Sequence, residues 1–481
     1  MGNAAHETVD QMNKEWVNPF KRLLNWKFMV SGVIIIIALV FAGIYYYQST
    51  RFNANITIND TKVGGLTADQ AIKKLGSSVL KNEVYVGQEQ IVDGNDTKMG
   101  FTNNDLPSIK KLLRKQLTLL PSSKAINYSL MSSKGDPYQS QTMKKLVEEK
   151  LNLMNKSLKA PQDAEAQLEQ GKIIVSQSIN GKQYDVASLL KDYQNQEYSS
   201  EIHLNAVYIL PIKADSPTVK NEEKMLQDLL QRTVDYKVQN QVYSLKGSDL
   251  IKNATVSKNM QYSFDAGGIT NKVAEINGSQ STLNKNYQFK THTGSVISVK
   301  GQSYGWAMDV GAESKRIQDA FEKGEKSVLA NSIYGVGWST YGIGYHTTTN
   351  NGIGDTYAEV SIQEQRIWIY KNGQLVVTTP VVTGRHDVNE DTPTGVWYIM
   401  YKQSPSVLKG SEVGNQNYSV KVSYWAPFTN SGCGFHDASW RTNWASNAYL
   451  NQGSGGCVNT PPSVMKTVYD NLTQNEPVVI Y

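Results

Sequence analysis

The residues with the clearest chemical potential lie in two short segments near the C-terminus, SGCGFHD (431–437) and GSGGCVN (453–459). His436 and Cys457 stand 21 residues apart, each flanked by glycines. A free thiol is mostly protonated at neutral pH, and a neighbouring imidazole can take its proton to give a nucleophilic thiolate. Gly455 and Gly456 let the chain bend tightly, so that the N–H groups of Gly456 and Cys457 can stabilise an oxyanion. The pattern predicts a cysteine acyltransferase; a packed thiol beside a structural histidine is the alternative.

Composition excludes several other classes of protein. The chain has 481 residues and only two cysteines, Cys433 and Cys457, which excludes a disulfide-rich scaffold and a four-cysteine zinc site. We expect no metal site and no cofactor, and no phosphate-binding loop is visible. The 48 basic and 43 acidic residues give a net charge of +5, too even for a dedicated nucleic-acid binder. Cys433 is interpreted as a small buried side chain, with an oxidative switch to Cys457 as the alternative.

An apolar segment near the N-terminus predicts a membrane anchor. Residues 28–47 contain no charged residue, and a helix of that length spans the hydrocarbon core. More basic residues precede the span than follow it within twenty residues, so the N-terminus is predicted to be cytoplasmic and residues 48–481 extracellular. A cleaved signal peptide is the alternative. The basic residues before the span are Lys14, Lys21, Arg22 and Lys27, and those after it are Arg51 and Lys62.

The rest of the chain divides by pattern into α+β segments and a mainly β domain. Thr67 to Gln70 has the form of a helix-capping box, and residues 221–235 have helical spacing. From residue 354 onward the pattern is β-rich: Asn372-Gly373 between two such runs predicts a hairpin, and one clear helix is expected at 462–472. The predicted divisions are a tail (1–27), an anchor (28–47), an α+β stalk (48–215), a second α+β domain with a Gly-rich linker (216–353) and a catalytic domain (354–481).

Residues 354–481 resemble the catalytic domain of L,D-transpeptidases of the YkuD type. That family carries a His followed, after about 14–21 residues, by Ser/Thr-His-Gly-Cys-x-Asn/Arg. The residues that match this pattern are His436, Ser454, Gly456, Cys457 and Asn459. Gly455 departs from it, because the family has His at that position. The departure leaves the base, His436, in place but removes a side chain able to orient substrate or tune the thiolate.

The resemblance implies a β-sandwich-like catalytic fold and a specific reaction on peptidoglycan stem peptides. Cys457 would attack the carbonyl that joins the third stem residue to the terminal D-Ala of a tetrapeptide. The acyl group would then pass to the side-chain amine of a second stem, which gives a 3→3 cross-link. Ser454 would help to orient His436, and carbapenems would inhibit the enzyme.

The segment before the catalytic domain carries two further resemblances. NITINDTKVGGLTADQAIKKL resembles the opening of extracellular domains that precede VanW-like and wall-modifying modules in Gram-positive bacteria. Residues 160–215 resemble the peptidoglycan-binding domain of the same proteins. A spacer that lifts the C-terminal domain into the wall is the alternative to ligand binding.

Five further residues are weaker candidates for contact with substrate. Aromatic residues before and after His436 are predicted to line or cover the site, although aromatic residues in a strand are more often core. Arg441 is a candidate for binding a stem carboxylate, with a solvated surface arginine as the alternative. Asn459 is expected to hold the loop after the nucleophile. The aromatic candidates are Tyr424, Trp425 and Trp440. Asp437 is not expected to orient His436, because adjacent side chains of a strand point to opposite faces.

Two other functions remain open at this level. A sortase-like enzyme also places His before Cys, but it needs a later arginine, and none follows Cys457. A wall-binding protein with an inactive YkuD-type domain is the second alternative, supported only by the Gly455 departure.

Overall fold

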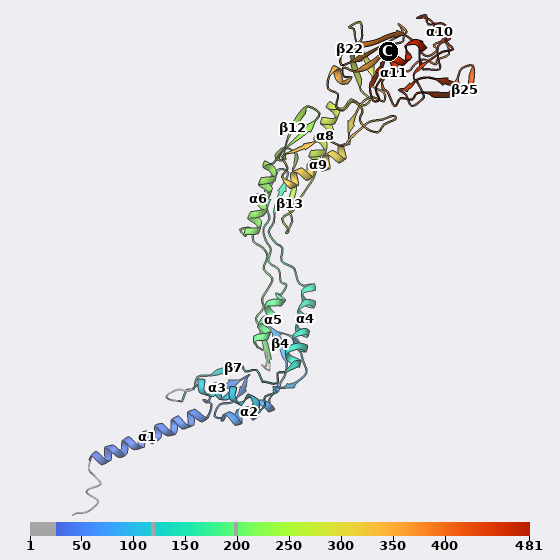
Figure 1. Ribbon diagram of the computed structural model, residues 1–481. Helices are drawn as coiled ribbons and strands as arrows, with labels where there is room; N and C mark the ends of the chain where they lie inside the picture. Colours follow the sequence, from blue (N-terminus) through green and yellow to red (C-terminus); the bar gives the residue numbers. More distant parts are fainter. Residues whose placement is uncertain (1–25, 117–120, 197–200) are drawn as a thin grey trace, which may run out of the picture. The chain divides into compact units, whose positions relative to one another are not determined.

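The computed structural model describes residues 26–116, 121–196 and 201–481 (Figure 1). Most of the predicted tail, as far as residue 25, therefore lies outside the described residues. The chain forms two compact units, Met1–Asp163 with Ser178–Lys213, and Ala164–Gln177 with Ala214–Tyr481.

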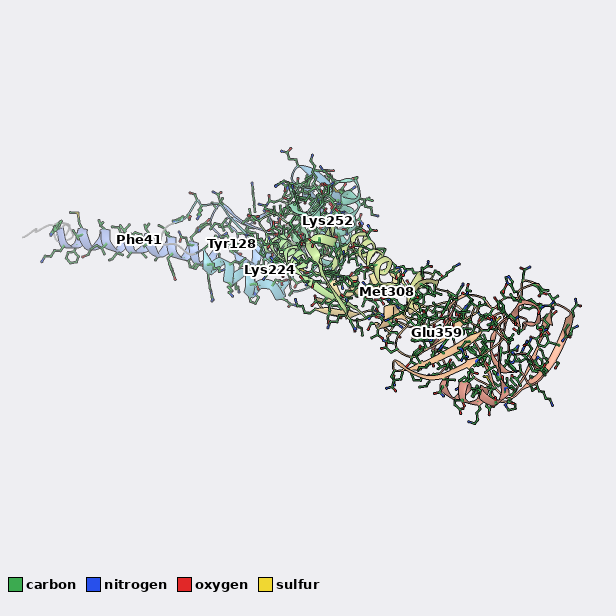
Figure 2. All side chains as sticks on the ribbon, turned by 90° about the horizontal axis from the view of Figure 1, so that it is seen from above. Phe41, Tyr128, Lys224, Lys252, Met308 and Glu359 are labelled. Atoms are coloured by element: carbon green, nitrogen blue, oxygen red, sulfur yellow. The ribbon has the colours of Figure 1, made fainter. Side chains whose placement is uncertain are left out.

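The first unit begins with a long apolar helix, α1 (Trp26–Thr50). It is long and apolar enough to cross a membrane, and a signal sequence would have the same properties. Its large side chains are exposed along most of its length; Phe41, labelled in Figure 2, is 51% exposed. A helix that is apolar all round and exposed over most of its length is suited to a lipid environment.

The remainder of the first unit consists of two small α+β cores. Thr67 caps α2 through its hydroxyl, and Gln70 completes the predicted capping box. One core gathers around Ile58, Leu75 and Ile109, and the other around Val84 and Leu151. The helices are α2 (Ala68–Ser77), α3 (Leu106–Lys115), α4 (Lys144–Ser157) and α5 (Val186–Asn195). The sheets are β2-β1-β7 (Thr61–Lys62, Ile56–Ile58, Ile126–Tyr128), β10-β4-β5 (Glu201–Leu204, Glu83–Val86, Glu89–Asp93) and β3-β6 (Val79–Leu80, Thr97–Lys98).

The second unit opens with an α+β domain. The predicted helix at 221–235 is observed as α6 (Pro217–Gln231), which starts earlier because Ser216 caps it and ends earlier because Thr233 begins a strand. The other helices are α7 (Gly247–Leu250), α8 (Gly267–Gln280) and α9 (Val310–Lys323). The sheets are β14-β13-β8-β9 (Tyr262–Phe264, Ala254–Val256, Ala166–Glu169, Lys172–Val175), β12-β11-β18 (Gln241–Lys246, Thr233–Val238, Ser327–Leu329), β15-β16 (Asn286–Lys290, Val296–Lys300) and β17-β19 (Ala307–Met308, Ile333–Tyr334).

The C-terminal domain is rich in strands, as predicted. Asn372 and Gly373 both have positive φ and join β21 to β22 in a two-residue turn, which confirms the predicted hairpin. The five-stranded sheet is β22-β21-β20-β29-β23 (Gln374–Pro380, Arg366–Lys371, Tyr357–Ser361, Pro477–Ile480, Gly395–Tyr398). The other strands form β26-β27-β28 (Trp425–Pro427, Gly434–Asp437, Val458–Thr460) and the hairpin β24-β25 (Ser406–Glu412, Asn415–Val422). The helices are α10 (Tyr449–Gln452) and α11 (Pro462–Asn471), the latter confirming the predicted helix.

The α+β domain and the strand-rich domain of the second unit share a core. Phe289 meets the ring of Tyr357 edge-on, and Tyr304 lies in the same cluster as Tyr398. Beside this core, the fully buried carboxylate of Glu359 accepts hydrogen bonds from the backbone N–H of His292 (2.9 Å) and from the hydroxyl of Tyr481 (2.5 Å). Figure 2 labels Glu359. A buried carboxylate with two donors on separate segments fixes one domain against the other.

We predict that Glu359→Ala destabilises the second unit by about 2–4 kcal/mol, because buried donors lose their acceptor. Urea unfolding followed by tryptophan fluorescence measures this loss. Glu364→Ala is the matched control, because the Glu364 carboxylate is half exposed and also lies near His292, 3.2 Å from its Nε2. It should cost less than about 1 kcal/mol. Equal effects of the two variants would contradict the assignment.

Candidate active site

Two parallel strands bring the separated His and Cys segments together. β27 pairs with β28 so that Phe435 lies opposite Val458 and His436 opposite Asn459. Cys457 immediately precedes β28, and its thiol lies 3.5 Å from the carbonyl oxygen of Gly432. Trp425 lies opposite His436 in the antiparallel pairing of strands β26 and β27. Its indole packs in one cluster with Cys457. The imidazole and the thiol thus share the environment of one buried indole.

His436 is held in a defined tautomer by a backbone carbonyl. Its Nδ1 lies 2.9 Å from the carbonyl oxygen of Asp437. A carbonyl oxygen only accepts, so Nδ1 carries the hydrogen and Nε2 is left as the basic nitrogen. The side chain is buried, and burial lowers the pKa of His436 below its ordinary value. The imidazole is therefore neutral at physiological pH.

The Cys457 thiol is also neutral in the resting protein. Burial is the main cause that raises its pKa, to about 12, and the nearby Cys433 and Glu412 add to the rise. A hydrogen bond with the Gly434 backbone acts in the opposite direction but does not compensate. A thiol and an imidazole that are both neutral differ from the thiolate–imidazolium pair of some cysteine enzymes. If the Cys457 sulfur attacks a carbonyl, its proton therefore has to be transferred during that attack and not before it.

The loop that leads to Cys457 (residues 453–457), named the nucleophile loop after the candidate nucleophile that it carries, is fixed by two hydroxyl groups. Ser454 donates to the carbonyl of Cys457 (2.6 Å) and accepts from the N–H of Gly456 (3.2 Å). Thr392 donates to the carbonyl of Gly456 (2.9 Å), and Gly456 has a φ of 109°, which favours glycine. The hydroxyl of Ser454 thus contacts the nucleophile loop, and the N–H of Gly456 is engaged with Ser454 in this state.

Glu412 occupies the space beside Gly455, where the family pattern has His. A Cβ built on Gly455 would lie 3.1 Å from Cβ and 3.2 Å from Oε2 of Glu412. Glu412 ends strand β24, so a hairpin far away in the sequence delivers this carboxylate to the nucleophile loop. A side chain at position 455 would therefore have to share this space with the side chain of Glu412.

The weaker candidates fall into two groups. Trp425 and Trp440 both flank His436, with ring centroids 5.9 and 5.8 Å from the imidazole. Trp440 is 50% exposed, so it is placed to cover the site. Tyr424 instead packs against Tyr469 on α11, in the domain core.

Arg441 and Asn459 have structural contacts near the site. The guanidinium of Arg441 donates to the carbonyl of Gln452, and burial lowers its pKa. Asn459 is buried, exchanges backbone hydrogen bonds with Val382 and lies opposite His436 in the parallel pair. Both residues therefore border the site without touching the thiol through a hydrogen bond.

Three residues with roles in the site were not predicted. Asp437 orients His436 through its backbone carbonyl, while its carboxylate accepts from the backbone of Ser423, consistent with the expectation that its side chain points away. Neither Thr392 nor Glu412 belongs to a motif that would indicate a role in the site. Cys433 is buried, and its sulfur would lie 2.8 Å from a Cβ on Gly456, so it packs under the nucleophile loop.

Comparison with known families agrees with this arrangement. Residues 355–480 match the model for the L,D-transpeptidase catalytic domain, and residues 218–330 match the model described as "Putative peptidoglycan binding domain". The second match falls in the predicted second α+β domain; the resemblance of residues 160–215 to such a domain stays a prediction. Among curated proteins, none matches the chain. Within the described residues, no group of three or more His, Cys, Asp or Glu side chains is placed to hold a metal ion.

Solved structures supply close relatives of the C-terminal domain. The catalytic domain of the Enterococcus faecium L,D-transpeptidase is 36% identical over 97% of that chain and 26% of this one, with a TM-score of 0.25. The same domain has also been solved acylated by ertapenem. A longer crystal structure, a cysteine-to-serine mutant of the E. faecium enzyme, is 24% identical over 99% of that chain and 54% of this one, with a TM-score of 0.45. By the family match and the 36% identity, this chain belongs to the L,D-transpeptidases, which are cysteine-dependent acyltransferases.

The raised thiol pKa gives a direct test of the resting state. We predict that iodoacetamide alkylates Cys457 slowly at neutral pH and that the rate still rises near about pH 10, because the thiolate is scarce below the thiol pKa. The rate is measured by mass spectrometry on the Cys433→Ala variant, in which Cys457 is the one remaining cysteine. A rate that reaches a plateau between about pH 6 and pH 8 would show a preformed thiolate and contradict the neutral pair.

Proposed function

We propose that this chain forms 3→3 peptidoglycan cross-links, with Cys457 as the nucleophile and His436 as the base. The observation that supports this most is the placement of both residues around Trp425, with Nδ1 of His436 bound to the carbonyl of Asp437 and Nε2 left for the thiol proton. The family match supports peptidoglycan as the substrate.

In the first half-reaction, His436 Nε2 takes the Cys457 proton as the sulfur attacks the carbonyl between the third stem residue and the terminal D-Ala. The oxyanion is bound by backbone N–H groups, with Cys457 and Gly456 as donors; for Gly456 the hydrogen bond to Ser454 must first open. The C–N bond then breaks, D-Ala leaves with the proton from His436, and a thioester remains. Ser454 positions the nucleophile loop through its bond to the Cys457 carbonyl.

In the second half-reaction, the side-chain amine of another stem attacks the thioester carbonyl. Its proton passes to His436 and then to the departing sulfur, which regenerates the neutral thiol. Trp440 covers the imidazole face, and Arg441 and Asn459 lie beside the site, where they could contact a bound stem. Acylation by carbapenems would use the same nucleophile, in line with the ertapenem-acylated E. faecium domain.

The proposed location is the outer face of the cell membrane. Helix α1 supplies the anchor, and the basic residues that precede it in the sequence favour a cytoplasmic N-terminus. The catalytic domain would then act on the wall outside.

The test is turnover of a disaccharide-tetrapeptide by the full chain in detergent. We expect release of D-Ala with formation of a cross-linked dimer, and a loss of at least about a thousandfold in Cys457→Ala and His436→Ala. His386→Ala, an exposed histidine of the same domain, is the control and should keep activity. Binding without turnover would leave the inactive wall-binding alternative in place of the proposed enzyme.

The lowered pKa of His436 determines the pH below which the activity falls. Activity needs the neutral imidazole, so it should persist as the pH falls through the ordinary histidine value of about 6.5 and decline only below it. The pH dependence of kcat/KM for D-Ala release measures this. An acid limb centred above about pH 7 would contradict a buried neutral base.

A further inference from the structure

A groove of about 630 Å³ lies in the α+β part of the second unit, away from the catalytic residues. The turn between β11 and β12 contributes Gln239 and Asn240, and Asn331 follows β18. Tyr341 and Thr348 come from the Gly-rich segment after β19. A second hollow of about 420 Å³ shares Gln239, Asn240 and Thr348 with it, so the two are continuous.

The lining of this groove combines amides, hydroxyls and aromatic rings with the apolar side chains of Leu329 and Ile333 and the imidazole of His346. In the described part of the chain, no Lys, Arg, Asp or Glu lines either hollow, although such residues make up 19% of the sequence. Tyr341 is 78% exposed, which leaves its ring open to a ligand. The walls are tied together, because Gln239 bonds to Tyr345 through its side-chain amide and Asn240 bonds to Thr348 (3.3 Å).

Such a lining suits a neutral ligand rich in hydroxyl and acetamido groups. Carboxamides both donate and accept, and a flat phenol ring packs on the apolar face of a sugar. Stem peptides carry carboxylate and ammonium groups, for which this groove offers no Lys, Arg, Asp or Glu partner among the described residues. Peptidoglycan has both kinds of component, so the composition of the groove discriminates between them.

We propose that this groove binds the glycan strand of the wall and not the stem peptide. The proposal rests on the wall-acting function proposed above, and it assigns a ligand class to a surface that lies partly within residues 218–330. By holding the glycan here, the chain would leave the stem peptides free to reach the nucleophile.

Binding of chitotetraose, a neutral N-acetylglucosamine oligomer, to the full chain in detergent tests this by calorimetry. We expect Tyr341→Ala and Asn331→Ala each to weaken binding by about tenfold, since each removes one direct contact. Tyr334→Ala is the matched control, because its neighbour Ile333 lines the groove and adjacent strand residues face opposite ways.

Absence of chitotetraose binding, unchanged binding in both variants, or competition by the free tetrapeptide would overturn the glycan assignment. Cross-linking of soluble disaccharide-tetrapeptide muropeptides by the wild-type chain is measured in parallel. Failure of the wild-type chain to turn over these muropeptides would instead count against the catalytic function, so the two outcomes are distinguishable.

A second, independent observation concerns Glu412 at the nucleophile loop. Its carboxylate lies against Gly455, is partly buried and makes no ion pair within 4 Å among the described residues, although its charge also acts on the Arg441 guanidinium. The second half-reaction requires an amine, which arrives from water as an ammonium ion. A carboxylate beside the thioester can bind that ammonium and place its nitrogen near the carbonyl carbon. The ammonium ion then releases one proton to water, and the resulting amine attacks the carbonyl.

We infer that Glu412 is the positioning residue for the acceptor amine. It lies beside Gly455, the position at which the family pattern has His. The inference rests on the proposed cross-linking reaction. A loss of the Glu412 carboxylate should affect the second half-reaction and not the first, because the donor step involves no ammonium ion at this position.

The test is Glu412→Gln in the full chain, with Nα-acetyl-lysine amide as a soluble acceptor. We expect acylation by ertapenem at least as fast as in the wild type, because a negative charge beside the thiol is removed, and an acceptor KM raised by about tenfold with kcat nearly kept. Glu412→Asp should restore part of the affinity, and Glu364→Gln is the remote control. An unchanged acceptor KM, or equal losses in both steps, would overturn the role of Glu412. Failure of the wild type to be acylated would instead refute Cys457 as nucleophile.

Discussion

The parallel pairing of β27 with β28 is the interaction on which the rest of the site depends. It aligns His436 with Asn459 and places Cys457 at the start of its strand beside the segment that leads to His436. The residues between the two strands are free to form the connection that carries Trp440 over the imidazole. Two parallel strands cannot be joined by a tight turn. His436 and Cys457 are therefore far apart in the sequence, and the pairing of their strands brings them together.

Burial is the second constraint, and it determines how the chemistry can proceed. The same packing that orients the imidazole and the thiol also withdraws both from water, which lowers one pKa and raises the other. A neutral pair protects the thiol from oxidation and alkylation until substrate arrives. Glu412 adds a negative charge near the sulfur, which disfavours the free thiolate further and favours an incoming cation. Both features favour the proposed mechanism, in which the proton is transferred during attack and an amine is the acceptor.

Local features of the fold were predictable, while contacts between distant segments were not. The Asn372-Gly373 turn and the Thr67 capping box follow from short-range rules, and the family pattern gave the fold of residues 354–481. The approach of Glu412 to Gly455 depends on where a hairpin folds back, and the orienting role of Asp437 belongs to its backbone carbonyl, which any residue could supply. The uncharged groove likewise joins residues from 239 to 348 that no periodicity links.

The central claim is that Cys457 carries the acyl group during cross-linking. Intact-mass analysis followed by peptide mapping, after rapid quenching of the chain with a disaccharide-tetrapeptide, tests it most directly. The account predicts an adduct on Cys457 with the mass of the donor less its terminal D-Ala. An adduct that retains D-Ala, one on Cys433, or turnover with no covalent species in the wild type would contradict it.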